Sequence, residues 1–158
     1  MILRQTEQSV IIHGGCLQIF NQGLLITGPS GIGKSELQLE LLDRGHYWVG
    51  DDVTKVERIQ QQLIAQCHSP PHLHQVAIKN LGIIDLSHLY SEQRFLSQTR
   101  LNAWIHLADS NSNAYSSLEE VDLLGIALPQ LTLYQSDKRP SALIVELFIK
   151  HHFSFQLN

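Results

Sequence analysis

The residues with the clearest chemical meaning form the run Gly28-Pro29-Ser30-Gly31-Ile32-Gly33-Lys34-Ser35. The run matches G-x-x-x-x-G-K-[ST] in full, the pattern of a loop that binds nucleotide phosphates. Glycines let successive backbone N–H groups point at one phosphate, and the positive end of a following helix attracts the same anion. Lys34 is expected to reach the β- and γ-phosphates, and Ser35 to bind Mg²⁺. The sequence therefore predicts that the chain binds ATP or GTP for phosphoryl transfer.

Two adjacent carboxylates, Asp51 and Asp52, follow the apolar run Tyr47–Val49. An acidic residue at the end of the strand after a phosphate-binding loop commonly binds Mg²⁺, directly or through water. A pair permits a division of labour, in which one carboxylate serves the metal and the other takes a proton from an attacking hydroxyl. The alternative is a polar turn that only ends the strand. His13 ends another apolar run, but spacing alone makes it a weak candidate for catalysis, because most single histidines are structural or exposed.

A second group of potential metal ligands, Cys67, His68, His72 and His74, lies within eight residues. Zinc sites usually combine two closely spaced pairs of ligands. This segment contains Pro70-Pro71 and lacks a second pair, which favours a loop over a zinc site.

The composition is typical of one globular domain, taken here as residues 1–158. Apolar residues make up 43% and charged residues 16%, and the formal net charge of -4 argues against binding to duplex nucleic acid. No apolar run is long enough to span a membrane, and the N-terminus lacks the apolar core of a signal peptide. With two cysteines, the chain is expected to be cytoplasmic and reduced. The last residues carry no stop signal, as expected if the chain is cut short of a further helix.

Short apolar runs separated by turn residues predict a sheet that positions these side chains. Helices are expected at Gly33–Arg44, ended by Gly45, at His88–Phe95, and from Pro140 at the first helical position to His152. Asp85 is interpreted as a cap for the second of these, and Ser110–Ala114 as a loop. Many strands and few helices favour a mixed sheet over strict βαβ alternation. The expected strands are Val10–Ile12, Leu17–Phe20, Leu24–Thr27, Tyr47–Val49, Val53–Val56, Leu63–Ala65, Val76–Ile78, Ile83–Asp85, Trp104–Leu107 and Leu131–Leu133.

A longer series of residues occurs in an order that is specific to one family. The series comprises His13-Gly14, Ile19-Phe20, Gly23 to Gly28, the phosphate loop, Glu36, Glu40-Leu41, Arg44-Gly45-His46, Asp51-Asp52, Leu81-Gly82-Ile83-Ile84-Asp85, and Arg139 followed by Ala142 to Glu146. In that order it resembles the catalytic core of HPr kinase/phosphorylase, over about Val10 to Phe148. The resemblance implies an α/β P-loop kinase domain with a mixed sheet, similar to phosphoenolpyruvate carboxykinase. It would be a short form without the family's N-terminal domain.

The resemblance also implies an activity. Members of the family use ATP and Mg²⁺ to phosphorylate a serine of HPr, the phosphocarrier of the sugar phosphotransferase system, and so regulate carbohydrate metabolism. They remove the phosphate with inorganic phosphate, releasing pyrophosphate, and many are hexamers. By position, Asp51 would be the general base, which returns a proton in the reverse direction, and His13 would sit beside Asp51 and tune it. Lys34 would bind phosphate, and Ser35 and Asp52 would bind Mg²⁺. Arg139 would assist catalysis near the substrate loop.

Three positions depart from the family pattern. Ala77 occupies the place of a glutamate that binds Mg²⁺, Lys79 that of an arginine, and Asn80 that of a glycine. Alanine cannot bind a metal, and lysine lacks the bidentate fork of arginine. Mg²⁺ keeps several waters and needs few protein ligands, so the remaining ligands could suffice. The alternatives are therefore a nucleotide-dependent sensor or regulatory module with weakened kinase chemistry, and a kinase of small molecules on the same scaffold.

Overall fold

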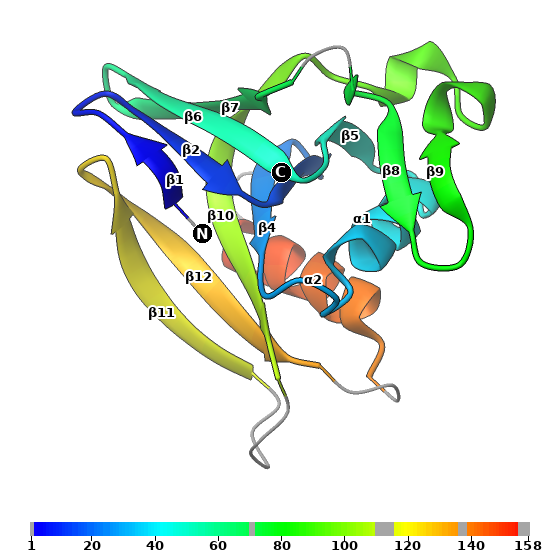
Figure 1. Cartoon of the computed structure of the whole chain (residues 1–158). Helices are drawn as coiled ribbons and strands as arrows, with labels where there is room; N and C mark the ends of the chain where they lie inside the picture. The colour runs from blue at the N-terminus through cyan, green and yellow to red at the C-terminus, as the bar shows by residue number, and fades with distance from the viewer. Residues whose placement is uncertain (1, 70–71, 110–115, 136–138, 155–158) are drawn as a thin grey trace.

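The computed structural model describes residues 2–69, 72–109, 116–135 and 139–154 (Figure 1). Its helices are α1 (Lys34–Asp43) and α2 (Ser141–His152), with short 3₁₀ helices at Leu86–His88 and Glu92–Arg94. Its strands are β1 (Ile2–Gln5), β2 (Ser9–His13), β3 (Gly15–Ile19), β4 (Gln22–Thr27), β5 (Tyr47–Gly50), β6 (Val53–Ile59), β7 (Gln62–Cys67), β8 (Gln75–Ile78), β9 (Gly82–Asp85), β10 (Gln98–Ala108), β11 (Ser116–Leu123) and β12 (Ile126–Tyr134).

The long strand β10 joins two parts of one mixed sheet. Its first residues pair antiparallel with β7, and the rest pairs parallel with β4 on one side and with β12 on the other. The main strand order is β1-β2-β6-β7-β10-β4-β3-β5, with β11 beside β12, while β8 and β9 form a separate hairpin. Parallel and antiparallel pairing within one sheet confirms the predicted α/β class with a mixed sheet.

The strand that leads into the phosphate loop, β4, lies at the centre of the core and is buried along its whole length. Leu24 and Ile26 pack with α1 and α2 in one apolar cluster, whereas Leu25 packs with β2, β6 and β7 in a second cluster. Successive side chains of a strand face opposite sides, so β4 contributes to both cores. Figure 1 shows the two helices together on one side of the sheet. Burial on both faces makes β4 a rigid base for the loop that follows.

Most of the predicted elements are confirmed with small boundary shifts, but β10 begins at Gln98 and β12 at Ile126, well before the predicted starts at Trp104 and Leu131. The prediction of one helix over His88–Phe95 is wrong, because the two 3₁₀ helices occupy this region. Asp85 does cap the first of them, accepting a hydrogen bond from the Ser87 backbone N–H at 2.9 Å. Pro140 precedes α2 as its N-cap residue instead of opening it. The predicted loop Ser110–Ala114 lies outside the described residues.

Strands β1 and β11 were not predicted, since neither has an alternating apolar pattern. Both are almost entirely exposed and are held by pairing with a single neighbour, β2 and β12 respectively. Backbone hydrogen bonds to a partner strand leave no periodic signal in the sequence. Among the described helices, none is long and apolar enough to cross a membrane.

Candidate active site

The phosphate-binding loop joins the end of β4 to the start of α1, as predicted. Gly31 and Gly33 have positive φ angles of 79° and 105°, a conformation that favours glycine. At Gly28, a Cβ atom would approach the Leu107 carbonyl oxygen to 2.7 Å, so a side chain there would displace the neighbouring β10. Gly33 is the N-cap of α1, and its carbonyl accepts the first helical hydrogen bond, from the Leu37 N–H. The loop therefore presents the N-terminus of a helix to an anion.

Lys34 and Ser35 take up different positions at the start of α1. The Lys34 ammonium lies over the loop, where it donates hydrogen bonds to the carbonyl oxygens of Gly28 at 2.8 Å and Pro29 at 3.0 Å. The Ser35 hydroxyl points toward the end of β5 and donates to both carboxylate oxygens of Asp51, at 3.2 and 3.1 Å. The Lys34 cation thus lies where it can bind a phosphate, and the Ser35 hydroxyl lies where it can bind the metal ion that accompanies the phosphate.

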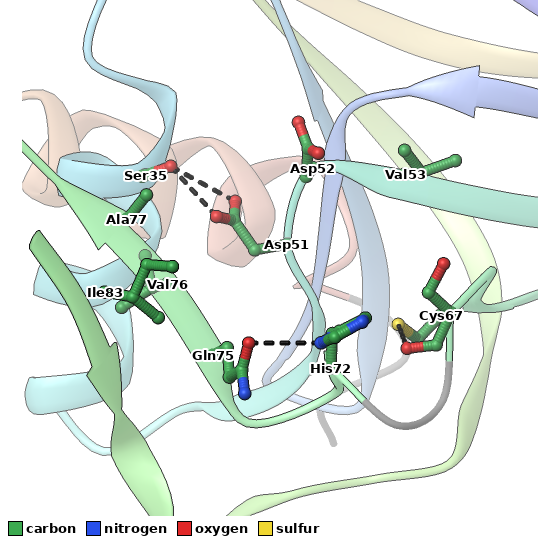
Figure 2. Close-up of a pocket in the computed structure, with 11 residues that line it drawn as sticks. Ser35, Asp51, Asp52, Val53, Cys67, His72, Gln75, Val76, Ala77 and Ile83 are labelled. Carbon is green, nitrogen blue, oxygen red and sulfur yellow. Dashed lines mark hydrogen bonds between the residues drawn. The ribbon is translucent and has the colours of Figure 1, made fainter.

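A tight turn at Asp51-Asp52 separates the two carboxylates. The Val53 N–H bonds to the Asp51 carbonyl at 2.8 Å, and Asp52 between them has a φ of 71°. Aspartate tolerates this left-handed conformation better than most residues. The turn directs Asp51 toward Ser35, while Asp52 projects on another side of the chain (Figure 2). Two adjacent residues consequently serve two separate contacts.

His13 contacts Asp52, not Asp51. Its Nε2 lies 2.9 Å from Asp52 Oδ1, and the side chains are 34% and 75% exposed. The predicted position of His13 beside Asp51 is therefore wrong. The reason lies in the register of the sheet: His13 at the end of β2 pairs with Val53, which places its ring next to the residue that precedes Val53. The expected grouping of Ser35 with Asp52 is also not observed, since Ser35 bonds to Asp51.

The surroundings of Asp51 shift its pKa. Burial raises the pKa of Asp51, and the hydrogen bond from Ser35 offsets part of this rise. The strand end that carries it is tied to α1 by Gln38, whose side-chain N–H₂ donates to the backbone oxygens of Gly50 at 2.6 Å and Cys16 at 3.2 Å. A half-buried carboxylate with a raised pKa is typical of a functional site, and a cation beside it would favour its ionised form.

Two cavities meet at these carboxylates. The smaller cavity, of about 240 Å³, is lined by residues of the phosphate loop together with His13, Asp51 and Asp52. The larger cavity, of about 340 Å³, is lined by the same two aspartates and extends toward His72 and Cys67. The β8–β9 hairpin contributes Ala77 to both cavities and Lys79 to the first. Ala77 and Ser35 are both among the residues that line the larger cavity in Figure 2. The position that differs from the family pattern thus belongs to the site.

Arg139 is the predicted site residue that stands apart. It lines another cavity, of about 320 Å³, on the opposite flank of α1, together with Gly33, Glu36 and Gln135. Its guanidinium donates to the Tyr134 carbonyl oxygen. The structure therefore brings His13, Lys34, Ser35 and the two aspartates together, and places Arg139 next to the loop from the other side.

Further residues support the site although sequence reasoning missed them. Beneath the loop, the Thr27 hydroxyl accepts a hydrogen bond from Trp104 Nε1 at 2.7 Å and contacts His106 Nδ1 at 2.8 Å. Burial lowers the pKa of His106, and the nearby Lys34 lowers it further. These contacts depend on the pairing of β10 with β4, which no local pattern reveals. Gln38 did leave a signal, because it is polar within the buried stripe of α1.

Comparison with known proteins gives a consistent result. The family model described as HPr Serine kinase C-terminal domain matches residues 4–156. The HPr kinase/phosphorylase of Alkaliphilus metalliredigens is 31% identical over 149 residues, covering 91% of this chain and 48% of the relative. The corresponding protein of Clostridium acetobutylicum is 35% identical over 142 residues, covering 85% and 46%. The chain thus spans about half the length of the curated relatives it matches.

A solved structure agrees with these sequence relatives. The Hpr(Ser) kinase/phosphatase of Coxiella burnetii superposes with a TM-score of 0.82 at 29% identity. The match covers 94% of this chain and 99% of that one, so the likeness extends over the whole fold.

Proposed function

Because this chain belongs to the HPr serine kinase C-terminal domain family, we propose that it transfers the γ-phosphoryl group of ATP to a serine of an HPr-like phosphocarrier protein. The observation that carries the proposal is the single cavity that contains the phosphate loop, the His13–Asp52 pair and Asp51. The residues that we propose for phosphate binding, metal binding and proton transfer, the three requirements of a kinase, all line this cavity. Regulation of carbohydrate metabolism, a cytoplasmic location and the absence of nucleic-acid or membrane partners belong to the same proposal.

The loop fits the phosphates of ATP, and Ser35 with Asp51 fits Mg²⁺. Glycines with positive φ and the N-terminus of α1 offer backbone N–H groups, and the hydroxyl and carboxylate are oxygen ligands of the kind that Mg²⁺ prefers. When bound, Mg²⁺ would neutralise charge that develops on the transferred phosphoryl group. This assignment replaces Asp52 with Asp51 as the metal-binding carboxylate.

Asp52 then becomes the better candidate for the general base. It is exposed to the cavity, is free of the Ser35 contact, and is oriented by His13 at 2.9 Å. In the kinase direction it would accept the proton of the serine hydroxyl. In the reverse direction, with inorganic phosphate as acceptor and pyrophosphate as product, it would return a proton to the serine oxygen. His13 would hold the carboxylate in place, and Lys34 would bind the β- and γ-phosphates.

Two parts of the proposal rest on the family alone. Arg139 would assist catalysis from the cavity beside α1, where it adjoins the phosphate loop. The chain would also assemble into a closed symmetric oligomer, a hexamer by analogy. Light scattering that finds a stable monomer at high protein concentration would contradict the second part.

Ala77 favours a second candidate, a nucleotide-binding sensor module with weakened kinase chemistry. It lines both cavities, as Ser35 does, and its methyl group adds no metal ligand. A site with fewer protein ligands for Mg²⁺ would bind nucleotide yet transfer the phosphoryl group slowly. The two candidates therefore differ in transfer rate, not in nucleotide binding.

The test is an incubation with γ-labelled ATP, Mg²⁺ and a panel of purified phosphocarrier proteins, followed by analysis for acid-stable phosphoserine. The Lys34→Ala variant is the matched control. Label on a serine of a phosphocarrier, absent with the variant, is the expected result. Tight ATP binding without label on any carrier favours the sensor module, and label on a small hydroxylated compound would indicate a small-molecule kinase.

A further inference from the structure

A polar cavity separate from the phosphate loop lies on the open face of the β1-β2-β6-β7 part of the sheet. Its volume is about 430 Å³. The residues that line it are Arg4, Thr6, Ser9, Ile11, Lys55, Gln66, Cys67 and His68. This lining combines two fixed cations, two hydroxyls, an amide and a histidine, and contains no carboxylate from the described part of the chain.

The register of the strands explains why these side chains converge. Arg4 pairs with Ile11, Ile11 pairs with Lys55, and Lys55 pairs with Gln66. Directly paired residues point to the same face of a sheet, so the four side chains form one row across four strands. The opposite face carries Val10, Val56 and other buried residues of the second apolar cluster, which leaves this row open to solvent.

The two cations of this row, Arg4 and Lys55, are largely available to bind an anion. In the described structure, the Arg4 guanidinium has neither an ion-pair nor a hydrogen-bond partner, and it is exposed. Lys55 Nζ contacts Glu57 Oε1 at 2.9 Å, a pair about one-third to two-fifths exposed. Glu7, on the turn between β1 and β2, does not line the cavity, and Asp52 on the same face is paired with His13. Exposed ion pairs contribute about 0–1 kcal/mol, so an anion can compete with Glu57 for Lys55.

We propose that this cavity binds a small phosphate-bearing anion, at a site distinct from the phosphate loop. The Arg4 guanidinium offers two parallel N–H groups to phosphate oxygens, and Lys55 offers a point charge. Thr6 and Ser9, whose hydroxyls are hydrogen-bonded to each other at 3.0 Å, also line the cavity, and one of the two can turn its O–H to a ligand. On the same face, two residues along β2 or about 7 Å, lies His13 of the proposed active site. The site does not depend on the proposed kinase function.

The test is a titration of the ¹⁵N-labelled chain with inorganic phosphate at constant ionic strength, followed by amide NMR. Two groups of amides should shift: those of the phosphate loop, and those around Arg4, Ile11, Lys55 and Gln66. Loss of one charge-assisted hydrogen bond weakens binding by about tenfold or more. Arg4→Gln should therefore weaken the second response by that factor, and the Arg4→Gln/Lys55→Gln double variant should abolish it. Lys150→Gln, which removes the same charge from α2, should change neither response.

Two further arms locate the source of the phosphate group. Glycerol 3-phosphate binding more tightly than inorganic phosphate indicates an organic phosphate as the ligand, and equal affinities indicate free phosphate; both support the site. Three results overturn it: shifts confined to the phosphate loop, equal shifts with sodium chloride, or a second response that survives in the double variant.

Discussion

Exchanging each aspartate separately for asparagine, Asp51→Asn and Asp52→Asn, tests the division of labour between them. Both substitutions keep the shape of the side chain and remove its charge and its capacity to take a proton. The contacts of the two carboxylates differ, since Asp51 accepts from Ser35 while Asp52 faces His13. We expect Asp52→Asn to slow phosphorylation and dephosphorylation together, and Asp51→Asn to weaken the use of Mg²⁺.

The expected magnitudes follow from these positions. A positioned acid or base contributes about 10²–10⁴-fold in rate, which corresponds to about 2.7–5.4 kcal/mol of barrier at about 1.36 kcal/mol per factor of ten. The Asp52 side chain is 75% exposed, so its contact with His13 contributes only about 0.2–1 kcal/mol to folding. Asp52→Asn should thus lose activity with almost no change in thermal stability.

Asp51→Asn, in contrast, should change the thermal stability. Because burial raises the pKa of Asp51, the folded state favours its protonated form, and this group's contribution to stability decreases as the pH rises through the raised pKa. At neutral pH without Mg²⁺, removal of the charge should therefore raise the melting temperature. Mg²⁺ with nucleotide should stabilise the wild-type chain more than the variant, because binding to the folded state shifts unfolding.

The assay measures forward and reverse rates against Mg²⁺ concentration for the wild-type chain and both variants, with melting curves in parallel. Excess Mg²⁺ should partly rescue Asp51→Asn and should leave Asp52→Asn unchanged. The reasoning is refuted if Asp51→Asn loses both reactions at every Mg²⁺ concentration while Asp52→Asn keeps its activity. If neither variant matters, the two residues form only a turn.

Three other substitutions have defined outcomes. Lys34→Ala should abolish transfer by removing the cation that the loop directs at the β- and γ-phosphates; unchanged label transfer contradicts the assignment. Ala77→Glu should lower the Mg²⁺ concentration needed for half-maximal rate, and an unchanged requirement means that this position is too far from the metal. Glu146→Gln should cost about 1–3 kcal/mol of unfolding free energy at pH 7 by breaking buried contacts to Arg44 and His46. Although burial alone raises the pKa of Glu146, those contacts lower it overall. The contribution of Glu146 to stability is thus fully present above its ordinary pKa of 4.5 and is lost as the pH falls through the lowered pKa. If wild type and Glu146→Gln differ in unfolding free energy by the same amount at pH 7 and at pH 3, this explanation is wrong.

The phosphate loop was predictable because its determinants are local. Gly28 to Ser35 are contiguous, and the strand before them and the helix after them leave clear patterns in the sequence. The existence of an acidic pair after the next strand was predictable for the same reason. Which carboxylate meets which partner was not, since it depends on the φ of 71° at Asp52 and on the pairing of His13 with Val53. Neither the turn nor the register has a signal within a short window of residues.

The same distinction explains the wider pattern of success and failure. Helix α1 was predicted because its buried face imposes a helical period, and β4 because burial on both faces gives a continuous apolar run between turn residues. The edge strands β1 and β11 were not predicted, because they are exposed and form only by pairing with a neighbouring strand. The family resemblance added residue roles that physics alone left open, but it transferred His13 to the wrong aspartate. A resemblance assigns positions along a chain, whereas side-chain pairing must be read from the fold.

The arrangement of the site also links its chemistry to its stability. Gln38 anchors the Asp51 strand end to α1, and burial makes the ionised Asp51 costly at neutral pH. A divalent cation held between Ser35 and Asp51 would relieve that cost, so metal–nucleotide binding would stabilise the junction of loop, helix and strand at once. With Ala77 contributing no carboxylate, Asp51 would be the charged ligand on which this proposed coupling depends. The residue least exposed of the pair is therefore suited to the metal, and the residue most exposed is suited to the proton.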